Sequence, residues 1–144
     1  MKKSSVLFIA AAICLFAVSG CKSVVTFDTL PENAQKFLTQ NFTDFPVSYA
    51  VREFNEYNVT LANGAEIEFN GKGEWRKVDM NHGVVPAAVV ATLPLSINSF
   101  LMASFANVPV EKIEKGFWPA YKVELVNGLE LEFNSKGICK NIDD

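Results

Sequence analysis

The feature that most constrains this fold is an internal repeat. The segment "NGAEIEFNGKG", residues 63–73, returns almost unchanged as "NGLELEFNSKG", residues 127–137. At an offset of 64 residues, 11 of the 17 positions from 57 to 73 are identical. A Leu-Pro pair at 30–31 also matches the pair at 93–94. We interpret the chain as a tandem duplication of one unit, because two copies are too few for a solenoid.

Each unit predicts one helix followed by strands. Apolar residues have helical spacing in residues 30–42 and 93–105, and a proline stands at each helix entry. Apolar and polar residues alternate in residues 58–61, 65–69, 122–125 and 129–133, which predicts strands with one apolar face.

Loop residues complete the predicted unit. The pairs Asn63-Gly64 and Asn127-Gly128 predict two-residue hairpin turns, in which both central residues have positive φ. Flanking strands and a short helix over residues 84–93 bring each unit to one helix on about four antiparallel strands. The predicted class is α+β, with helices on one sheet face and the other face open. The first unit is predicted over residues 30–83 and the second over residues 84–144, together forming one compact domain.

The N-terminus reads as a bacterial lipoprotein signal. Lys2 and Lys3 precede a charge-free apolar run, residues 6–18, that is too short to span a bilayer comfortably. Small residues stand directly before Cys21, as in a lipobox. We therefore predict a signal peptide over residues 1–20 and lipidation of Cys21, which would anchor the body to a membrane. An ordinary signal peptide with a chance cysteine, or an uncleaved anchor, remains an alternative.

Residues 21–29 are predicted to form a short tether. Lys22 follows the cysteine where an aspartate would favour retention in the inner membrane. By resemblance to bacterial lipoproteins, this favours the outer membrane of the cell envelope, with the body facing the periplasm.

Charge and cysteine content restrict the possible partners. Without Lys2 and Lys3, 11 basic residues face 16 acidic ones, a formal charge of −5. Nucleic acids and anionic lipids bind basic patches, so neither is an expected partner. Cys139 would be the one free thiol after processing, which leaves no intramolecular disulfide. We interpret it as a small buried hydrophobic residue, although His82, the single histidine, leaves a Cys-His pair open.

The order of these motifs is similar to that of the PepSY-like family of periplasmic proteins, common in Bacteroides. The matching features are the leading Leu-Pro helix, the "KGEW" turn with Trp75, "GVVP" at residues 83–86 and the second "YKVELVNGLELEF". The resemblance implies the fold of beta-lactamase-inhibitor proteins and a non-enzymatic binding or regulatory role. Where the family often has aspartate at the second turn, this chain has Asn70 and Asn134.

Paired glutamates are the strongest candidates for catalysis. Glu66 with Glu68, and Glu130 with Glu132, point to the same sheet face about 6.5 to 7 Å apart along a strand. That separation overlaps the separations used by glycosidases. General acid catalysis needs one desolvated carboxyl group, however, and all four glutamates are predicted to lie in water. We predict no enzyme activity, no catalytic residue and no cofactor.

Metal binding has little support in the sequence. The chain lacks paired histidines and an EF-hand pattern. Asp79, Asn81 and His82 lie between the units and are weak candidates for calcium ligands.

Aromatic residues are candidate binding anchors. Strand alternation predicts Trp75 on the outer sheet face, where an exposed tryptophan is typical of an interface hot spot. The alternative is that Trp75 folds over the adjacent turn and seals a sheet edge. Phe117 and Trp118 are predicted in a turn, or else at the end of the core.

Two functional hypotheses follow. The first is an anchored binding or regulatory module, in which Trp75, Phe117, Trp118 and the four glutamates engage another envelope protein. The second is a small-ligand or calcium-responsive sensor that uses residues 79–82 and the turn asparagines.

Overall fold

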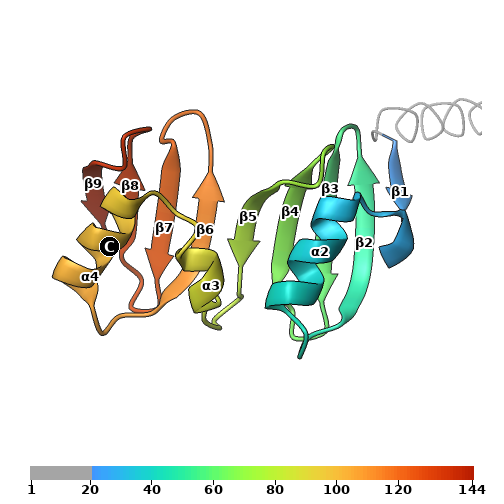
Figure 1. Ribbon diagram of the computed structural model, residues 1–144, viewed down its shortest axis with the longest axis horizontal. Coiled ribbons are helices and arrows are strands. Elements are labelled where there is room, and N and C mark those ends of the chain that lie inside the picture. Colours follow the sequence, from blue (N-terminus) through green and yellow to red (C-terminus); the bar gives the residue numbers. More distant parts are fainter. Residues whose placement is uncertain (1–20) are drawn as a thin grey trace, which may run out of the picture.

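The computed structural model describes residues 21–144, which form one antiparallel sheet with helices on one side (Figure 1). The predicted signal peptide, residues 1–20, lies outside the described residues. The strands are β1 (Lys22–Val24), β2 (Val47–Glu53), β3 (Glu56–Leu61), β4 (Glu66–Asn70), β5 (Trp75–Asp79), β6 (Val110–Lys115), β7 (Tyr121–Leu125), β8 (Glu130–Phe133) and β9 (Cys139–Asp143). The helices are η1 (Phe27–Thr29, a 3-10 turn), α2 (Glu32–Asn41), α3 (Ala87–Val90) and α4 (Leu95–Phe105).

The nine strands follow one another in chain order across a single sheet. The order of a helix followed by four strands occurs twice, as α2 with β2 to β5 and α4 with β6 to β9. Strands β5 and β6 join the two halves through only three residue pairs, from Lys77↔Glu114 to Asp79↔Lys112. The sequence left open whether the units share one sheet, and this ladder makes them continuous.

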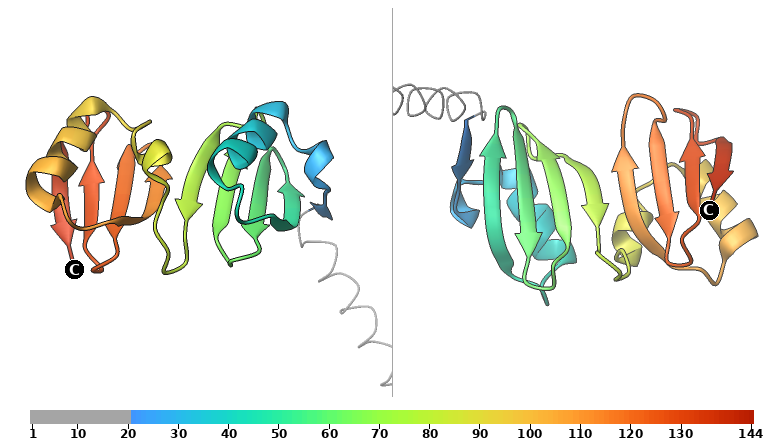
Figure 2. Two further views of the ribbon diagram at one scale, coloured as in Figure 1. Left: turned by 60° about the horizontal axis from the view of Figure 1, so that its bottom comes forward. Right: turned by 180° about the vertical axis from the view of Figure 1, so that it is seen from behind.

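The hydrophobic core lies between the sheet and helices α2, α3 and α4. The right view of Figure 2 shows the opposite sheet face with no helix over it. In the first half the Phe37 ring of α2 meets the Phe69 ring of β4 edge-on at 5.7 Å, and in the second Phe100 of α4 meets Phe133 of β8 at 5.5 Å. Both strand phenylalanines are fully buried. The alternating strand pattern therefore predicted the buried face correctly for these residues.

The predicted tether is in part regular structure. Residues 21–29 contain strand β1, which pairs antiparallel with β2, and the short helix η1. Val24 opposite Val51 and Lys22 opposite Glu53 extend the sheet by one strand. A run of only three residues is too short to show strand periodicity in the sequence. It forms a strand because it pairs with β2.

The first hairpin turn differs from the prediction. Gly64 has φ +86°, but Asn63 does not have a positive φ. The loop is therefore not the predicted two-residue turn, in which both residues have positive φ. Instead the Gly64 N–H donates to the Leu61 carbonyl and the Ala65 N–H donates to the Asn63 side chain at 3.1 Å. A three-residue loop with glycine at its last position accounts for this pattern. Asn127 and Gly128 repeat it.

The second turn of each half is tied to the helix above it. Asn70 accepts hydrogen bonds from the Lys72 and Glu74 N–H groups through its side-chain oxygen, both at 3.0 Å. The Asn33 amide of α2 then donates to the Lys72 carbonyl at 3.0 Å. In the other half, Ser96 of α4 donates to the Lys136 carbonyl at 2.9 Å. These bonds set the position of each helix along the sheet.

Across residues 21–144, every helix is too short or too polar to cross a membrane.

Candidate functional site

The open face, meaning the sheet surface without helices, carries rows of polar residues that run across the strands. One row passes through the paired residues Asn58, Glu68, Lys77, Glu114, Lys122, Glu132 and Asn141. A second row passes through Thr60, Glu66, Asp79, Lys112, Glu124, Glu130 and Asp143. The first row alternates in sign, whereas the second has five acids and one lysine.

The net negative charge of residues 21–144 is concentrated on the open face. Strand register places ten acidic residues there, Glu53, Glu56, Glu66, Glu68, Asp79, Glu114, Glu124, Glu130, Glu132 and Asp143, and four lysines, Lys22, Lys77, Lys112 and Lys122. Residues 21–144 hold 16 acidic and 11 basic residues, so six acidic and seven basic remain elsewhere. The open face has a formal charge of −6 and the rest of the body +1.

The four predicted rim glutamates all lie on the open face, but three of them have lysine partners. Lys77 Nζ is 3.4 Å from Glu68, and Lys122 Nζ is 2.9 Å from Glu130 and 3.9 Å from Glu132. The hydrogen bond to Glu130 raises the pKa of Lys122. Glu66 is exposed. Three of the four carboxylates form ion pairs and the fourth is exposed to solvent, which is unlike the desolvated acid that glycosidases use.

The prediction from the sequence that Trp75 lies on the open face is wrong. Its side chain is 8% exposed and stacks on Phe37 of α2, with ring centroids 5.9 Å apart. The cause is a β-bulge, because Glu68 pairs with Lys77 while the next residue, Phe69, pairs with Trp75. An extra residue reverses the alternation on that side of the bulge. Trp75 is therefore a core residue on the helix side.

The same bulge occurs at Cys139. Glu132 pairs with Asn141 while Phe133 pairs with Cys139, so the thiol also lies on the helix side and packs against the core. Burial raises the pKa of the Cys139 thiol, which makes it a poor nucleophile. Cys21, which directly precedes β1, is exposed.

Phe117 and Trp118 are two highly exposed aromatic residues in the turn between β6 and β7. Phe117 is 99% exposed and Trp118 is 75% exposed. They stand at the end of the sheet beside the junction of the two halves. Their exposure excludes the alternative that they close the core.

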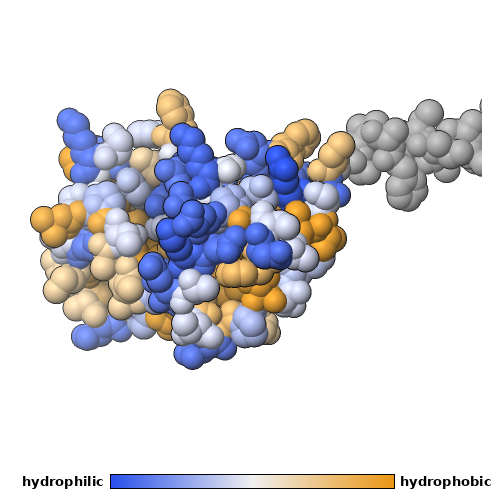
Figure 3. Space-filling view, turned by 45° about the vertical axis from the view of Figure 1, so that its right-hand side comes forward, coloured by the Kyte–Doolittle hydropathy of each residue, from blue (hydrophilic) through white to orange (hydrophobic). Residues whose placement is uncertain are grey.

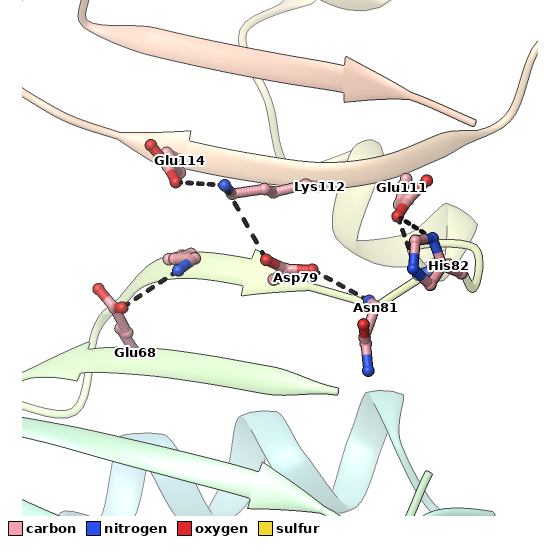
Figure 4. A network of polar contacts seen from close by, with 8 residues as sticks. Glu68, Asp79, Asn81, His82, Glu111, Lys112 and Glu114 are labelled. Carbon is pink, nitrogen blue, oxygen red and sulfur yellow. Dashed lines mark hydrogen bonds and ion pairs between the residues drawn. The ribbon is translucent and has the colours of Figure 1, made fainter. Parts of the chain in front are cut away.

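The junction residues Asp79, Asn81 and His82 already have protein partners (Figure 4). Asp79 accepts from the Asn81 N–H at 3.0 Å and lies 3.9 Å from Lys112 Nζ. The His82 N–H donates to Glu111 at 2.8 Å, and its ring nitrogen Nδ1 is 3.4 Å from the same carboxylate. Among the described residues, no three acidic, histidine or cysteine side chains converge as a metal site would need.

The helix side has a different surface. Figure 3 shows hydrophilic side chains across the middle and hydrophobic patches to either side of them. One apolar groove, of ≈ 570 Å³, lies between α3 and α4 and includes Val90, Leu101 and Met102 in its lining.

A central crevice opens where β5 and β6 separate. The ladder ends at Lys77↔Glu114, so Arg76 and Lys115 would form the next pair, but the strands diverge there. Two hollows flank these side chains. One, of ≈ 420 Å³ on the helix side, includes Phe37 and Trp75, and the other, of ≈ 730 Å³ on the open side, includes Phe54 and Phe117.

Lys115 is the most perturbed group of the crevice. Its ammonium lies over the Trp75 ring, 3.3 Å from the centroid. Burial, together with the nearby charge of Arg76 and against the opposing effect of Glu74, lowers the pKa of Lys115 to about 8. Sequence reasoning missed Arg76 and Lys115, because only the register between β5 and β6 brings them together.

Lys115→Met is expected to stabilise the protein at pH 7 and to lose that advantage by pH 10. Native Lys115 gives up its proton near pH 8, whereas in the unfolded chain it does so near 10.5, so wild-type stability rises between these values. Because Lys115 is partly exposed to solvent, the stability difference between the variant and the wild type should shrink by only about 1 kcal/mol between pH 7 and pH 10. Urea unfolding of both proteins at pH 7 and pH 10 measures this change. The same difference in unfolding free energy at both pH values would contradict a lowered pKa of Lys115.

Comparison with solved structures places this fold among periplasmic proteins of Bacteroides. A protein from Bacteroides vulgatus, described as a "putative periplasmic protein from DUF2874 family", is 29% identical with a TM-score of 0.79, covering 88% of this chain and 99% of its own. A "putative calcium-regulated periplasmic protein" from Bacteroides thetaiotaomicron is 32% identical with a TM-score of 0.76, covering 85% and 97%. A third, also from Bacteroides vulgatus and described as a "putative periplasmic protein of unknown function", is 30% identical with a TM-score of 0.76, covering 85% and 99%.

No curated protein matches the chain. The descriptions of the structural relatives support a periplasmic location for it. A family model described as "Putative beta-lactamase-inhibitor-like, PepSY-like" matches residues 55–141, well over half of the chain. Together with the TM-score of 0.76 and the 32% identity to a relative that is covered over 97% of its length, this match shows that the chain belongs to the PepSY-like family.

Proposed function

We propose that this protein is a non-enzymatic, lipid-anchored envelope module whose open face docks a protein with a basic surface. The observation that carries the proposal is the concentration of charge on an uncovered sheet, with ten acidic and four basic residues on the open face and a nearly neutral remainder. Charge complementarity of this kind steers association and selects partners. A family described as inhibitor-like is consistent with a binding role.

Exposed aromatic residues supply the apolar part of the proposed interface. Phe117 and Trp118 project from the turn that ends β6, at the border of the open face. Aromatic anchors beside a polar surface are typical of interface hot spots. Trp75 is removed from this set because it is buried.

The proposed lipid anchor also orients the open face. Cys21 directly precedes β1, the edge strand, so an acylated Cys21 would hold that sheet edge close to the outer membrane on its periplasmic side. The acidic face would be repelled by anionic head groups and would be left free for a basic partner.

The duplication is part of the proposal. Equivalent contacts recur in both halves, including the helix-to-turn bonds of Asn33 and Ser96 and the ring pairs of Phe37 and Phe100. The second half would then extend the open face rather than build a second domain.

Reversing two charges on the open face is expected to weaken partner capture strongly. Glu66→Lys and Glu124→Lys together change the acidic row without removing the partner of a paired lysine. Protein expressed from the full chain is used as bait for envelope extracts, and retained proteins are identified and tested again in purified form. A partner bound through a basic surface is eluted by salt and binds the variant at least about tenfold more weakly.

A charge-matched variant provides the control. Asp44→Lys with Asp144→Lys makes the same change in net charge away from the open face, and it should retain the partner. Phe117→Ala with Trp118→Ala tests the aromatic border in the same assay. Equal capture by the open-face variant and the wild type would overturn the docking proposal.

Calcium response is the second candidate, favoured by the 32% identity to a protein described as calcium-regulated. Ligands would have to come from Asp79, Asn81 and the turn asparagines. The side-chain oxygens of Asp79, Asn70 and Asn134 already accept hydrogen bonds from backbone N–H groups. Binding at millimolar calcium would raise the melting temperature, because a ligand of the native state stabilises it. An unchanged melting temperature in calcium, compared with magnesium, would remove this candidate.

A further inference from the structure

We propose that the central crevice is a binding site for a carboxylate attached to an apolar group. This site shares Phe117 with the proposed docking interface, but the proposal does not depend on docking at the open face. It is built by Arg76 and Lys115, with aromatic walls from Phe54 and Phe117 on one side and Phe37 and Trp75 on the other.

The first observation is two like charges held together without a counterion. Arg76 and Lys115 occupy the position after the last residue pair of β5 and β6, and they are close enough for the guanidinium to lower the pKa of the lysine. Like charges opposite each other on neighbouring strands are destabilising. Within residues 21–144, neither cation has an acid within ion-pair distance. An anion between them would relieve the repulsion.

The nearest acid of the chain does not fill this role. Glu74 lines the helix side of the crevice, but its carboxylate accepts a hydrogen bond from the Asn70 amide at 2.7 Å. Glu68 lines the open side and pairs with Lys77 instead. Both cations are therefore available to an external ligand.

The surroundings favour a carboxylate over a phosphate. Glu56, Glu68 and Glu74 also line the two hollows and would repel a dianion more strongly than a monoanion. A planar carboxylate matches the fork of an arginine, and the lysine contributes a point charge. The aromatic wall of one of the two hollows would hold the apolar part, since small-molecule sites are mostly apolar with a few convergent polar groups.

Calorimetry with N-acetylphenylalanine tests this proposal, using protein expressed from the full chain. The acid is expected to bind, and its C-terminal amide, which has nearly the same shape without the charge, at least tenfold more weakly. Arg76→Gln and Lys115→Met are each expected to weaken binding of the acid at least tenfold. Lys140→Met, which removes an exposed lysine of β9, should leave it unchanged within twofold.

Trp75 reports where the ligand binds. In a Trp118→Phe background it is the one remaining tryptophan of the chain, which has two. Its emission should change on titration with the acid, because a bound carboxylate draws the Lys115 ammonium away from the ring. The carboxylate could belong to the C-terminus of a protein or to a small molecule, and a five-residue peptide ending in phenylalanine distinguishes the two. Tighter binding of the peptide than of N-acetylphenylalanine indicates a protein C-terminus. Equal or weaker binding of the peptide indicates a small molecule.

Either source supports the proposal. Equal binding of the acid and the amide would overturn it, as would unchanged affinity in both the Arg76 and Lys115 variants. Tighter binding of inorganic phosphate than of the acid would overturn the choice of a carboxylate.

Discussion

Phe133→Ala is expected to lower the free energy of unfolding by about 3–5 kcal/mol. The side chain is completely buried on β8 and meets Phe100 of α4 edge-on at 5.5 Å. Its removal leaves a cavity between the sheet and the helix that covers the second half, and the surrounding strands hold that cavity open. Urea unfolding followed by circular dichroism measures the change, with a fall in melting temperature of at least about 10 °C.

Phe117→Ala is the matched control for this prediction. It deletes the same atoms from a side chain that is 99% exposed, so the unfolding free energy should change by less than about 0.5 kcal/mol. A small effect here is also required for the capture experiment, in which Phe117 is replaced to test binding. A loss for Phe133→Ala no larger than that for Phe117→Ala would mean that the second half lacks the described core.

Gly73→Ala is expected to cost about 3 kcal/mol, for two reasons that add. Gly73 has φ +79°, a conformation that costs an alanine about 1–2 kcal/mol. A methyl group there would also lie 2.8 Å from the backbone nitrogen of Ala34 and 2.8 Å from Pro31 Cβ. The helix start would have to move, and the bond from Asn33 to the Lys72 carbonyl would be strained.

Gly128→Ala separates these two contributions. Gly128 has a similar φ of +89°, but a methyl group there meets nothing within 4 Å. Its cost should therefore be the conformational part alone, about 1–2 kcal/mol. Thermal and urea unfolding of the two variants give the difference. Equal costs would show that α2 does not press on the turn as described.

The distribution of charge gives the two proposed sites different ligands. The acidic open face would attract basic surfaces, whereas the crevice presents two cations to an anion. Both meet at the junction of β5 and β6, where Glu68 and Glu114 flank Lys77. A partner that binds the open face and also carries a carboxylate could use both sites. The charge variants described above separate them, because Glu66 and Glu124 do not line the crevice.

Local patterns in the sequence predicted most of the elements. The alternation in residues 65–69 and 129–133 identified the buried residues Ile67, Phe69, Leu131 and Phe133, because successive strand side chains must point to opposite faces. The apolar spacing in residues 30–42 and 93–105 identified α2 and α4. The four rim glutamates were placed on the correct face for the same reason.

Failures occurred where one residue changes the register. Counting back from Val78 placed Trp75 on the open face, but the bulge opposite Phe69 moved it to the core. The Asn-Gly pairs suggested two residues with positive φ, but the loop has three residues and needs only one. Strand β1 was taken for a tether because its three residues form a strand only by pairing with β2.

The sequence by itself determined the repeated helix-and-strand order and which side of each regular strand is apolar, because both follow from local periodicity. Only the tertiary structure decided that the nine strands form one sheet, that its charge collects on one face, and that Arg76 and Lys115 meet. These features depend on the pairing of β5 with β6, which are separated in the sequence by helices α3 and α4. Pairing between distant segments leaves no periodic signal in either segment.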